Sequence, residues 1–406
     1  MTYTPSQELL QRYARLLVDY ALGGGNGIKP GDVVHITAPD SAKPLYVEAC
    51  RAVWQSGGQV LDGYYPDDES DLKVSPVRYE TASDEQLDFF PEKYFRGLID
   101  QTDHSLHIMA ENDPAVLQEI SPDKIMRFRR SRRLLVEWRN EKENAGQYTW
   151  TIGLYATQAM ASEAGMSLEE YWEQVALACF LDDEDPISRW RQLNQEIEER
   201  AAWLNSLPID RLHVEGQDAD LWLTLGEQRK WMGGGGANIP SFEVFTSPDW
   251  RGTEGWIRFS EPLYIYGSLI TGVELEFRDG LVVSARAKER QDLLEAMIAT
   301  DNANRVGEFS MTDAGLSRIN RFMANTLYDE NVGGPYGNTH VAVGMAIKQC
   351  YDGDPGSVSE AEWDRLGFND SVVHTDIVST TDRTVTAVMR DGPEQVIYRD
   401  GHFTGV

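Results

Sequence analysis

Two histidines and a nearby carboxylate in the last quarter of the chain have the types and spacing to do chemistry. His374 and Asp376 lie two residues apart in the run SVVHTDIVST, which is rich in valine and isoleucine. Residues two apart on a strand leave the same face, so both side chains could bind one metal ion or share a proton. His340 opens the apolar run HVAVGMAI. A lone histidine there fits two interpretations, a hydrogen-bonded core residue or a ligand.

Two glutamates lie in similar apolar surroundings upstream. Glu243 is part of the run FEVFT, and Glu308 is part of RVGEFSM. Charged residues are seldom left unpaired in such runs. Carboxylate oxygens together with imidazole nitrogens form a ligand set of the type that binds one or two divalent cations.

Several segments of the chain, taken in order, resemble the successive motifs of the aminopeptidase T family of metal-dependent exopeptidases. The segments are IPSFEVFTSPD, GEFSM, TLYDEN, GNTHVAVG and HTDIV, with weaker likeness in GIKPGDVVHITAP and GQDADLWLTLG. The resemblance implies two divalent metal ions, zinc, cobalt or manganese, on five ligands: Glu243, Glu308, His340, His374 and Asp376. It also implies a homodimer that acts on short peptides.

One position departs from the family pattern. The family has a tyrosine at the metal seven residues after the first histidine, and this chain has Ile347, which can neither coordinate nor donate a hydrogen bond. If HVAVGMAIKQCY is helical, residues 340, 344 and 347 share a face. Tyr351 would then lie about 16 Å along the helix axis from His340, too far to substitute. Tyr336, in a Gly-Pro-Tyr-Gly turn, is a second candidate replacement.

The resemblance implies a metalloaminopeptidase in which Glu243 and His340 bind mainly one ion, His374 binds the other, and Glu308 or Asp376 bridges them. A carboxylate must also accept a proton, and Glu308 or Glu330 could serve. Glu330, in the triplet DEN, could instead be a further ligand, a hydrogen-bonding partner of the ligands, or a solvated loop carboxylate.

Two other hypotheses stay open. His340, His374 and Asp376 form the two-histidine, one-carboxylate set of non-haem iron oxygenases, and the fold resembles that of the dihydroxypyridine ring-opening dioxygenases. Retention of Glu243 and Glu308 favours the peptidase, since one iron would not need them. The last hypothesis is a binding protein that kept the fold and lost the chemistry.

Charge and composition exclude several classes of protein. Lys and Arg number 37 against 66 Asp and Glu, which gives a formal net charge of −29. This field repels nucleic-acid backbones and anionic membranes and attracts metal ions and amines. The three cysteines, widely spaced, form no disulfide framework, and no apolar run reaches membrane-spanning length. We therefore expect a cytoplasmic protein, with no nucleic-acid or membrane partner.

The first half of the chain predicts an α/β domain over residues 1–206 with a mostly parallel sheet. A helix begins after Ser6, and DVVHITAP, AKPLYVEACRAVWQSG and GQVLDGYY form a βαβ unit. HSLHIMA is expected to be a strand with His104 and His107 on opposite faces, and His35 is expected to be structural. The basic run from Arg127 is interpreted as a solvated helix face. Ser167 and Glu170 have capping-box spacing at the start of another helix.

The second half predicts an α+β domain over residues 207–406 that carries the metal site. Short strands dominate it, and the Asp-Gly pairs in FRDGLVV and MRDGPEQV favour antiparallel hairpins. The run Gly233–Gly236 lacks the Lys-Ser/Thr of a phosphate loop and is expected to be a mobile loop over the site. HExxH and GxSxG motifs are absent, which leaves no basis for a zincin or a serine hydrolase.

Overall fold

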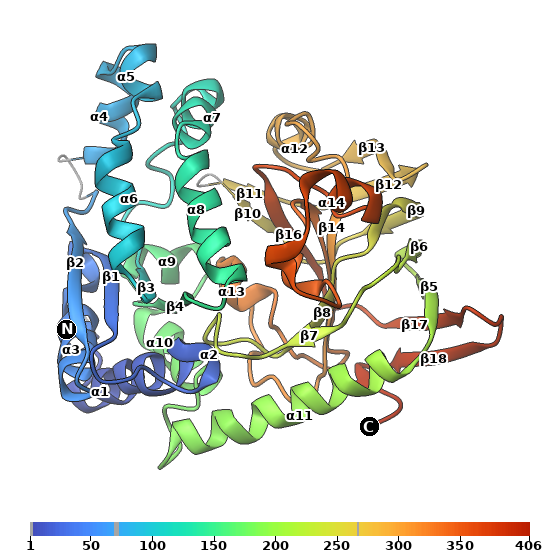
Figure 1. Ribbon diagram of the computed structural model, residues 1–406, viewed down its shortest axis with the longest axis horizontal. Helices are drawn as coiled ribbons and strands as arrows, with labels where there is room; N and C mark the ends of the chain where they lie inside the picture. The colour runs from blue at the N-terminus through green and yellow to red at the C-terminus, as the bar shows by residue number, and fades with distance from the viewer. Residues whose placement is uncertain (1–2, 69–72, 266–267) are drawn as a thin grey trace. The chain divides into compact units, whose positions relative to one another are not determined.

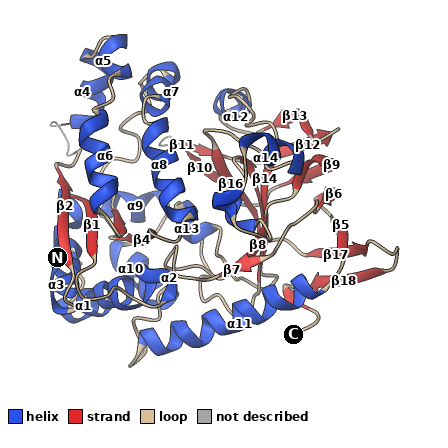
Figure 2. Cartoon of the chain, in the orientation of Figure 1, coloured by secondary structure: helices blue, strands red, loops and turns tan. Residues whose placement is uncertain are grey.

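The computed structural model describes residues 3–68, 73–265 and 268–406. The chain divides into two compact units, the first built mainly from Met1–Arg191 and the second from Gln192–Gly234, Ser241–Ile265 and Leu269–Val406. The division falls within helix α11, Pro186–Ser206 (Figure 1). Helices predominate in the first unit and strands in the second (Figure 2). Within the described ranges, no helix combines the length and apolar character needed to cross a membrane.

Unit 1 contains a parallel sheet with the strand order β2-β1-β3-β4. The strands are β1 Val33–Pro39, β2 Gln59–Tyr65, β3 His104–Met109 and β4 Thr149–Leu154. Helix α3, Lys43–Gln55, connects β1 to β2, so the predicted βαβ unit is confirmed. Alternate residues of β1, Val34, Ile36 and Ala38, are buried, as expected for a strand covered on that face.

Two helices of unit 1 begin where the sequence predicts their starts. Ser6 caps α1 by accepting a hydrogen bond from the Leu9 amide, and Ser167 with Glu170 forms a capping box at α10. The helices are α1 Gln7–Leu16, η1 Leu17–Ala21, α2 Leu22–Gly25, η2 Asp40–Ala42, α4 Val74–Thr81, α5 Asp84–Asp88, α6 Glu92–Gln101, α7 Pro122–Arg130, α8 Arg133–Asn144, α9 Gln158–Glu163 and α10 Leu168–Ala178.

The segment predicted to be a strand around His104 and His107 is strand β3, and both of its histidines have hydrogen-bonding partners. His104 Nε2 lies 2.9 Å from Asp32 Oδ2, and its Nδ1 lies 2.8 Å from Thr149 Oγ1. His107 Nδ1 lies 2.8 Å from Thr37 Oγ1. The His104 imidazole therefore links the residue before β1 to the start of β4, and the His107 imidazole contacts the middle of β1.

The basic run of α7 and α8 is a solvated helix face paired with local acids, as predicted. Arg127 donates hydrogen bonds to Asp84 at 2.9 Å and to Asp88 at 2.6 and 2.9 Å. Arg127 is partly exposed and both aspartates are half-exposed or more, so the pairs contribute little to stability.

Unit 2 contains an antiparallel sheet with the order β13-β12-β9-β6-β5-β17-β18-β19. Both predicted hairpins are present, and φ is positive at Asp279 and Gly280 in the first turn, as a two-residue Asp-Gly turn requires. The strands are β5 Ile209–Gly216, β6 Ala219–Thr224, β9 Asp249–Arg258, β12 Glu274–Arg278, β13 Leu281–Arg286, β17 Arg383–Met389, β18 Glu394–Arg399 and β19 His402–Phe403. The other short elements are β10 Leu263–Ile265, β11 Ser268–Ile270, α12 Gln291–Ile298, α13 Thr326–Asp329, η3 Lys348–Cys350, η4 Pro355–Ser357 and α14 Glu360–Leu366.

A second antiparallel sheet in unit 2 has the order β16-β15-β14-β8-β7. Its strands are β7 Met232–Gly233, β8 Glu243–Thr246, β14 Val306–Thr312, β15 Asn338–Gly344 and β16 His374–Ser379. Every residue of β14 and β15 is buried. The fold class predicted from the sequence, a mostly parallel N-terminal sheet and antiparallel C-terminal sheets, is confirmed.

The helical arrangement considered for HVAVGMAIKQCY is wrong. Residues 338–344 form strand β15 between β14 and β16. The rest of the run HVAVGMAIKQCY contains one 3₁₀ turn, η3, at Lys348–Cys350. A short apolar run fits a buried strand as well as a helix, and pairing on both sides decides for the strand. His340 and Ile347 therefore share no helix face, and the helical spacing used for Tyr351 does not apply.

Candidate metal centre

Strand register gathers the five predicted ligands on one face of the β16-β15-β14-β8-β7 sheet. Glu308 pairs with Ala342 on β15, and Ala342 pairs with Asp376 on β16. Directly paired residues point to the same face, as do residues two apart along a strand. His340 lies two residues before Ala342, and His374 lies two before Asp376.

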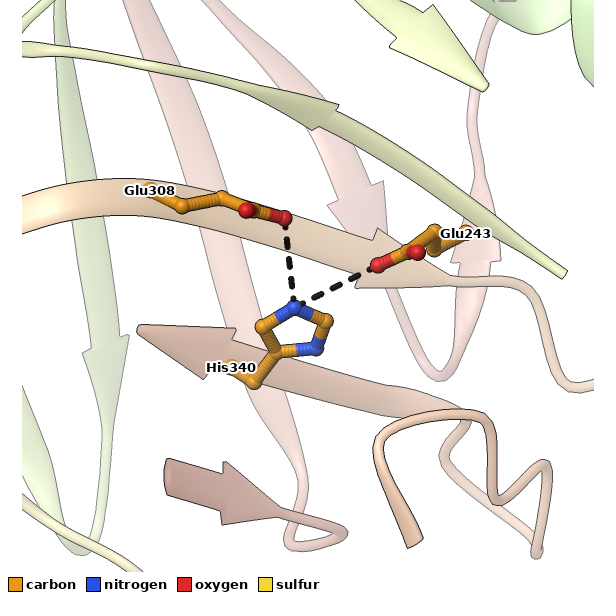
Figure 3. A group of neighbouring side chains, drawn as sticks. All are labelled: Glu243, Glu308 and His340. Carbon is orange, nitrogen blue, oxygen red and sulfur yellow. Dashed lines mark ion pairs between the residues drawn. The ribbon is translucent and has the colours of Figure 1, made fainter. Parts of the chain in front are cut away.

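Glu243 joins this face from β8. It pairs with Thr312, which lies on the same face of β14 as Glu308 because four residues separate them. Figure 3 shows Glu243, Glu308 and His340 pointing toward one another from three neighbouring strands. The sheet therefore brings together residues that are far apart in the sequence.

The carboxylate oxygens surround the Nε2 atoms of the two histidines. His340 Nε2 lies 3.3 Å from Glu243 Oε2 and 3.5 Å from Glu308 Oε1. His374 Nε2 lies 3.4 Å from Glu308 Oε2 and 3.5 Å from Asp376 Oδ1. Each oxygen of Glu308 thus faces a different imidazole.

These distances define two groups of candidate ligands that share one residue. The first is Glu243, Glu308 and His340, and the second is Glu308, His374 and Asp376. Within each group the ligand atoms lie within 4.8 Å of one another. Among the described residues, these two are the groups of three or more His, Cys, Asp or Glu side chains with this geometry.

The candidate ligands of the first group are buried, so their negative charges need a compensating positive charge such as a metal cation. Glu243 is 7% exposed, Glu308 3% and His340 1%. Burying several carboxylates together is costly unless positive charge compensates them. A carboxylate and imidazole donor set suits borderline or hard divalent ions such as zinc, manganese or cobalt. The side chain of His374 is 25% exposed, so the second group is the more accessible.

Neighbouring hydrogen bonds orient the donors. Ser310 donates to Glu243 Oε2 at 3.1 Å, and Ser241 donates to Glu243 Oε1 at 3.3 Å. His374 Nδ1 lies 2.8 Å from the Met345 carbonyl oxygen, which can only accept. The Nδ1 atom must therefore carry the proton, which leaves the Nε2 lone pair of neutral His374 free to coordinate. Within the described part of the chain, His340 Nδ1 has no hydrogen-bond partner.

The ionisation of the cluster reflects its crowded charge. Burial raises the pKa of Glu243 to about 7. The charge of His340 acts against this rise, and the charge of Glu308 adds to it. Burial would lower the pKa of His340, but hydrogen bonding to Glu308 and the other carboxylate charges raise it to about 9. Burial would raise the pKa of Asp376, but the charge and hydrogen bond of His374 lower it to about 2. The neighbouring carboxylates thus stabilise positive charge in the cluster, whether a proton on His340 or a metal cation.

Glu330 also belongs to this cluster. It follows helix α13, is 6% exposed, and shares a hydrogen bond with Asp376. Burial, together with the nearby charges of Asp376 and Glu243, raises its pKa well above the usual range. Its interpretation as a solvated loop carboxylate is therefore wrong, and Glu330 is placed to hold a proton beside the candidate ligands.

Comparison with known proteins decides the family. The family model described as thermophilic metalloprotease (M29) matches residues 6–403. The chain belongs to the M29 family. An aminopeptidase T from Thermus thermophilus is 28% identical over 98% of this chain and 99% of its own length. M29 membership makes this chain a metallopeptidase, a hydrolase, and confirms the predicted resemblance.

Solved structures agree with the M29 assignment. Wild-type AmpT from Thermus thermophilus superimposes with a TM-score of 0.82 at 25% identity, covering 98% of this chain and 99% of that one. The 2,5-dihydroxypyridine dioxygenase from Pseudomonas putida KT2440 gives a TM-score of 0.53 at 13% identity, with 99% of each chain covered. This second likeness concerns the fold alone.

The position that departs from the M29 pattern lies against an apolar cluster. Ile347 packs on the cluster formed by Ala346, Cys350, Trp363, Leu366 and Phe368, and its amide donates to Ser247 Oγ at 2.8 Å. Tyr351 packs edge-on against Trp363 in the same cluster. The side chain of Tyr336 is 41% exposed. No contact described for either tyrosine reaches the five candidate ligands.

Sequence reasoning missed the residues that orient the ligands. Ser310 lies two residues after Glu308 on strand β14, so strand alternation could have placed it on the ligand face. Ser241 lies two residues before Glu243, just ahead of strand β8. The Met345 carbonyl carries no such signal, because a backbone atom is available at every position. The run Gly233–Gly236 contains consecutive glycines with positive φ at 234, 235 and 236, and its mobility stays a prediction.

Proposed function

We propose that this protein is a metal-dependent aminopeptidase that releases N-terminal residues from short peptides. The observation that carries the proposal is Glu308, whose two carboxylate oxygens face two different histidines and so join two ligand groups. Its M29 relatives named aminopeptidases support the class of reaction. The net charge of −29 favours substrates that carry a protonated amine.

Glu243, Glu308 and His340 would hold one divalent ion, and Glu308, His374 and Asp376 would hold the other. When bound, such ions polarise a carbonyl and make a water acidic near neutral pH. Glu308 is the shared ligand in this proposal, because each of its oxygens faces a different histidine. Asp376 uses a single oxygen, which lies 3.5 Å from His374 Nε2 and 3.8 Å from His340 Nε2. Ser241 and Ser310 keep both oxygens of Glu243 in place, and Met345 keeps the His374 ring in one orientation.

Glu330 is the proposed proton carrier. Both oxygens of Glu308 are already directed at histidines, which leaves it poorly suited to the role. Glu330 lies outside both ligand groups yet beside Asp376. Its carboxylate would accept the proton of the attacking water and return it to the amine that leaves.

The test combines metal content with substrate choice. Protein purified without chelators or added metal should carry about two zinc, cobalt or manganese equivalents per chain. It should hydrolyse a short peptide with a free N-terminus and leave the N-acetylated form of the same peptide intact. Equal cleavage of both peptides, or activity that persists after metal removal, would refute the proposal.

The same analysis would detect the oxygenase considered above. That reaction needs about one iron per chain and a site made of His340, His374 and Asp376. Among the described residues, both candidate ligand groups instead contain Glu308, and each contains a single histidine, His340 in one and His374 in the other. The homodimer and the cytoplasmic location stay predictions.

A further inference from the structure

The side-chain amide of Asn331 connects its own turn, which carries Leu327 and Glu330, to the approach to strand β8. Its Oδ1 accepts a hydrogen bond from the Phe242 amide at 2.6 Å. Its Nδ2 donates to the Leu327 carbonyl at 3.0 Å and lies 3.4 Å from Glu330 Oε1. Phe242 immediately precedes the ligand Glu243, so one amide contacts both the approach to strand β8 and the carboxyl group of Glu330.

The turn that carries Glu330 is also held from strand β15. Asn338 Nδ2 donates to the Glu330 carbonyl at 2.9 Å and to the Val332 carbonyl at 2.7 Å. Asn338 lies two residues before the ligand His340. Asp329 accepts from the amides of Met323 and Asn325, which closes the other side of the turn. The backbone of Glu330 is therefore fixed between strand β15 and the loop that carries Met323 and Asn325, and Asn331 extends this constraint to its carboxyl group.

We propose that Asn331 is a positioning residue that fixes the carboxyl group of Glu330 relative to Glu243. This inference rests on the proposed function, in which Glu330 carries the proton. Asn331 is fully buried and touches Glu330 rather than the predicted metal ligands themselves. Its effect is therefore on the place of the proton carrier and not on the number of metal ions bound.

Asparagine suits this position because its amide offers one acceptor and two donor hydrogens on a short, planar group. All three functions are used here. Aspartate keeps the acceptor and loses both donors. Alanine has neither the acceptor nor the donors, so the buried Phe242 amide and Leu327 carbonyl lose the partner that Asn331 provides. The two substitutions therefore separate the link to β8 from the link to Glu330.

The first experiment uses metal-free protein and needs no activity. Hydrogen exchange reports the Phe242 amide, and the ¹³C resonance of the Glu330 carboxyl group, assigned by its loss in Glu330→Gln, reports the proton carrier. Asn331→Ala should speed exchange at Phe242 and shift the Glu330 resonance. Asn331→Asp should shift the Glu330 resonance while Phe242 stays protected, which keeps the test open if the alanine variant fails to fold.

Gln291→Ala is the matched control. The Gln291 amide accepts from the Ala287 amide at 2.6 Å and donates to the Ala285 carbonyl and to Glu295, each at 2.9 Å. This is the same bonding pattern, also in unit 2, on helix α12. The control should lose similar hydrogen bonds and leave Phe242 exchange and the Glu330 resonance unchanged.

The second experiment measures turnover in the metal-loaded enzyme. A carrier displaced by a fraction of an ångström to 1 Å should lower kcat about 10- to 100-fold. The KM and the metal content should stay near wild type in both Asn331 variants. In a Glu330→Gln background the same substitutions should lower kcat little further, because the group they position is gone.

The outcomes separate the two proposals. An unchanged Glu330 resonance in both Asn331 variants, or a kcat loss that multiplies fully with that of Glu330→Gln, would overturn the positioning role. Wild-type protein that hydrolyses no peptide would overturn the proposed function. In that case the exchange and resonance data would still decide whether Asn331 fixes Glu330.

Discussion

Replacing Glu308 by glutamine should weaken both candidate metal positions at once. The substitution keeps the volume of the side chain and removes its charge. Each ligand group has three members, and Glu308 is the member common to both. Loss of a hydrogen-bonding partner of a ligand costs about 10- to 100-fold in metal affinity, so loss of a charged ligand should cost at least about 100-fold for each ion. That is about 2.8 kcal/mol for each ion, since every tenfold in affinity is about 1.4 kcal/mol.

Equilibrium dialysis against buffered zinc, followed by elemental analysis, measures this effect directly. The wild type should bind about two equivalents with high affinity. Glu243→Gln should weaken one equivalent alone, because Glu243 belongs to the first group alone. Glu143→Gln is a suitable control in unit 1, where the Glu143 carboxylate accepts from Trp150 Nε1 at 2.9 Å. That variant should keep both equivalents.

The pattern of loss distinguishes a shared carboxylate from two separate sites. Loss of a single equivalent in Glu308→Gln would mean that Glu308 serves one ion. Loss of both equivalents in Glu243→Gln would mean that the two metal positions do not bind independently. Either result would refute the division derived from the distances, and circular dichroism would show whether the variant had simply unfolded.

Three further predictions concern a hydrogen bond to a ligand, the pH dependence of metal affinity, and a glycine at the end of strand β15. Ser310→Ala removes the hydrogen bond to Glu243 Oε2 and should weaken one zinc equivalent about 10- to 100-fold in the same dialysis, with the other unaffected. Ligands must lose their protons to bind a cation, and the pKa values of Glu243 and His340 are raised to about 7 and about 9. Metal affinity should therefore rise with pH up to about 9, with proton release at neutral pH that calorimetry in buffers of different ionisation enthalpy detects; pH-independent affinity over this range would contradict the assignment. Gly344→Ala should destabilise the protein by about 1–3 kcal/mol or more, because φ is +102° there and a Cβ would lie 2.0 Å from a carbonyl oxygen. Thermal unfolding should show a smaller loss for Gly392→Ala, where φ is +95° and no atom lies within 4 Å of the added Cβ.

The parts of the fold predictable from the sequence are those governed by local signals. Ser6 and Ser167 mark helix starts because a side-chain oxygen there satisfies amides that the helix leaves free. The pair Asp279-Gly280 marks a hairpin because the turn needs positive φ at both positions. His374 and Asp376 share a face because the period of a strand is two, whatever the rest of the fold does.

The secondary structure after His340 depends on partners rather than on local signals. The run from His340 to Ile347 is almost wholly apolar, so neither a period of two nor a period of 3.6 is visible in it. Its strand character comes from β14 on one side and β16 on the other. A central strand of this kind has no polar face to reveal its period.

The hardest feature to predict is the one that brings Glu308 into the site. Val306 pairs with Val343, yet Glu308 pairs with Ala342, so Gly307 is an extra residue that forms a β-bulge. In the register of Val306, Glu308 would oppose Val341 on the other face of the sheet, away from His340. A Cβ at residue 307 would lie 2.3 Å from the Met345 carbonyl oxygen, which explains why glycine stands there. A glycine inside a strand-like run suggests a bulge, but only the pairing with β15 shows that the bulge turns this glutamate toward the histidines.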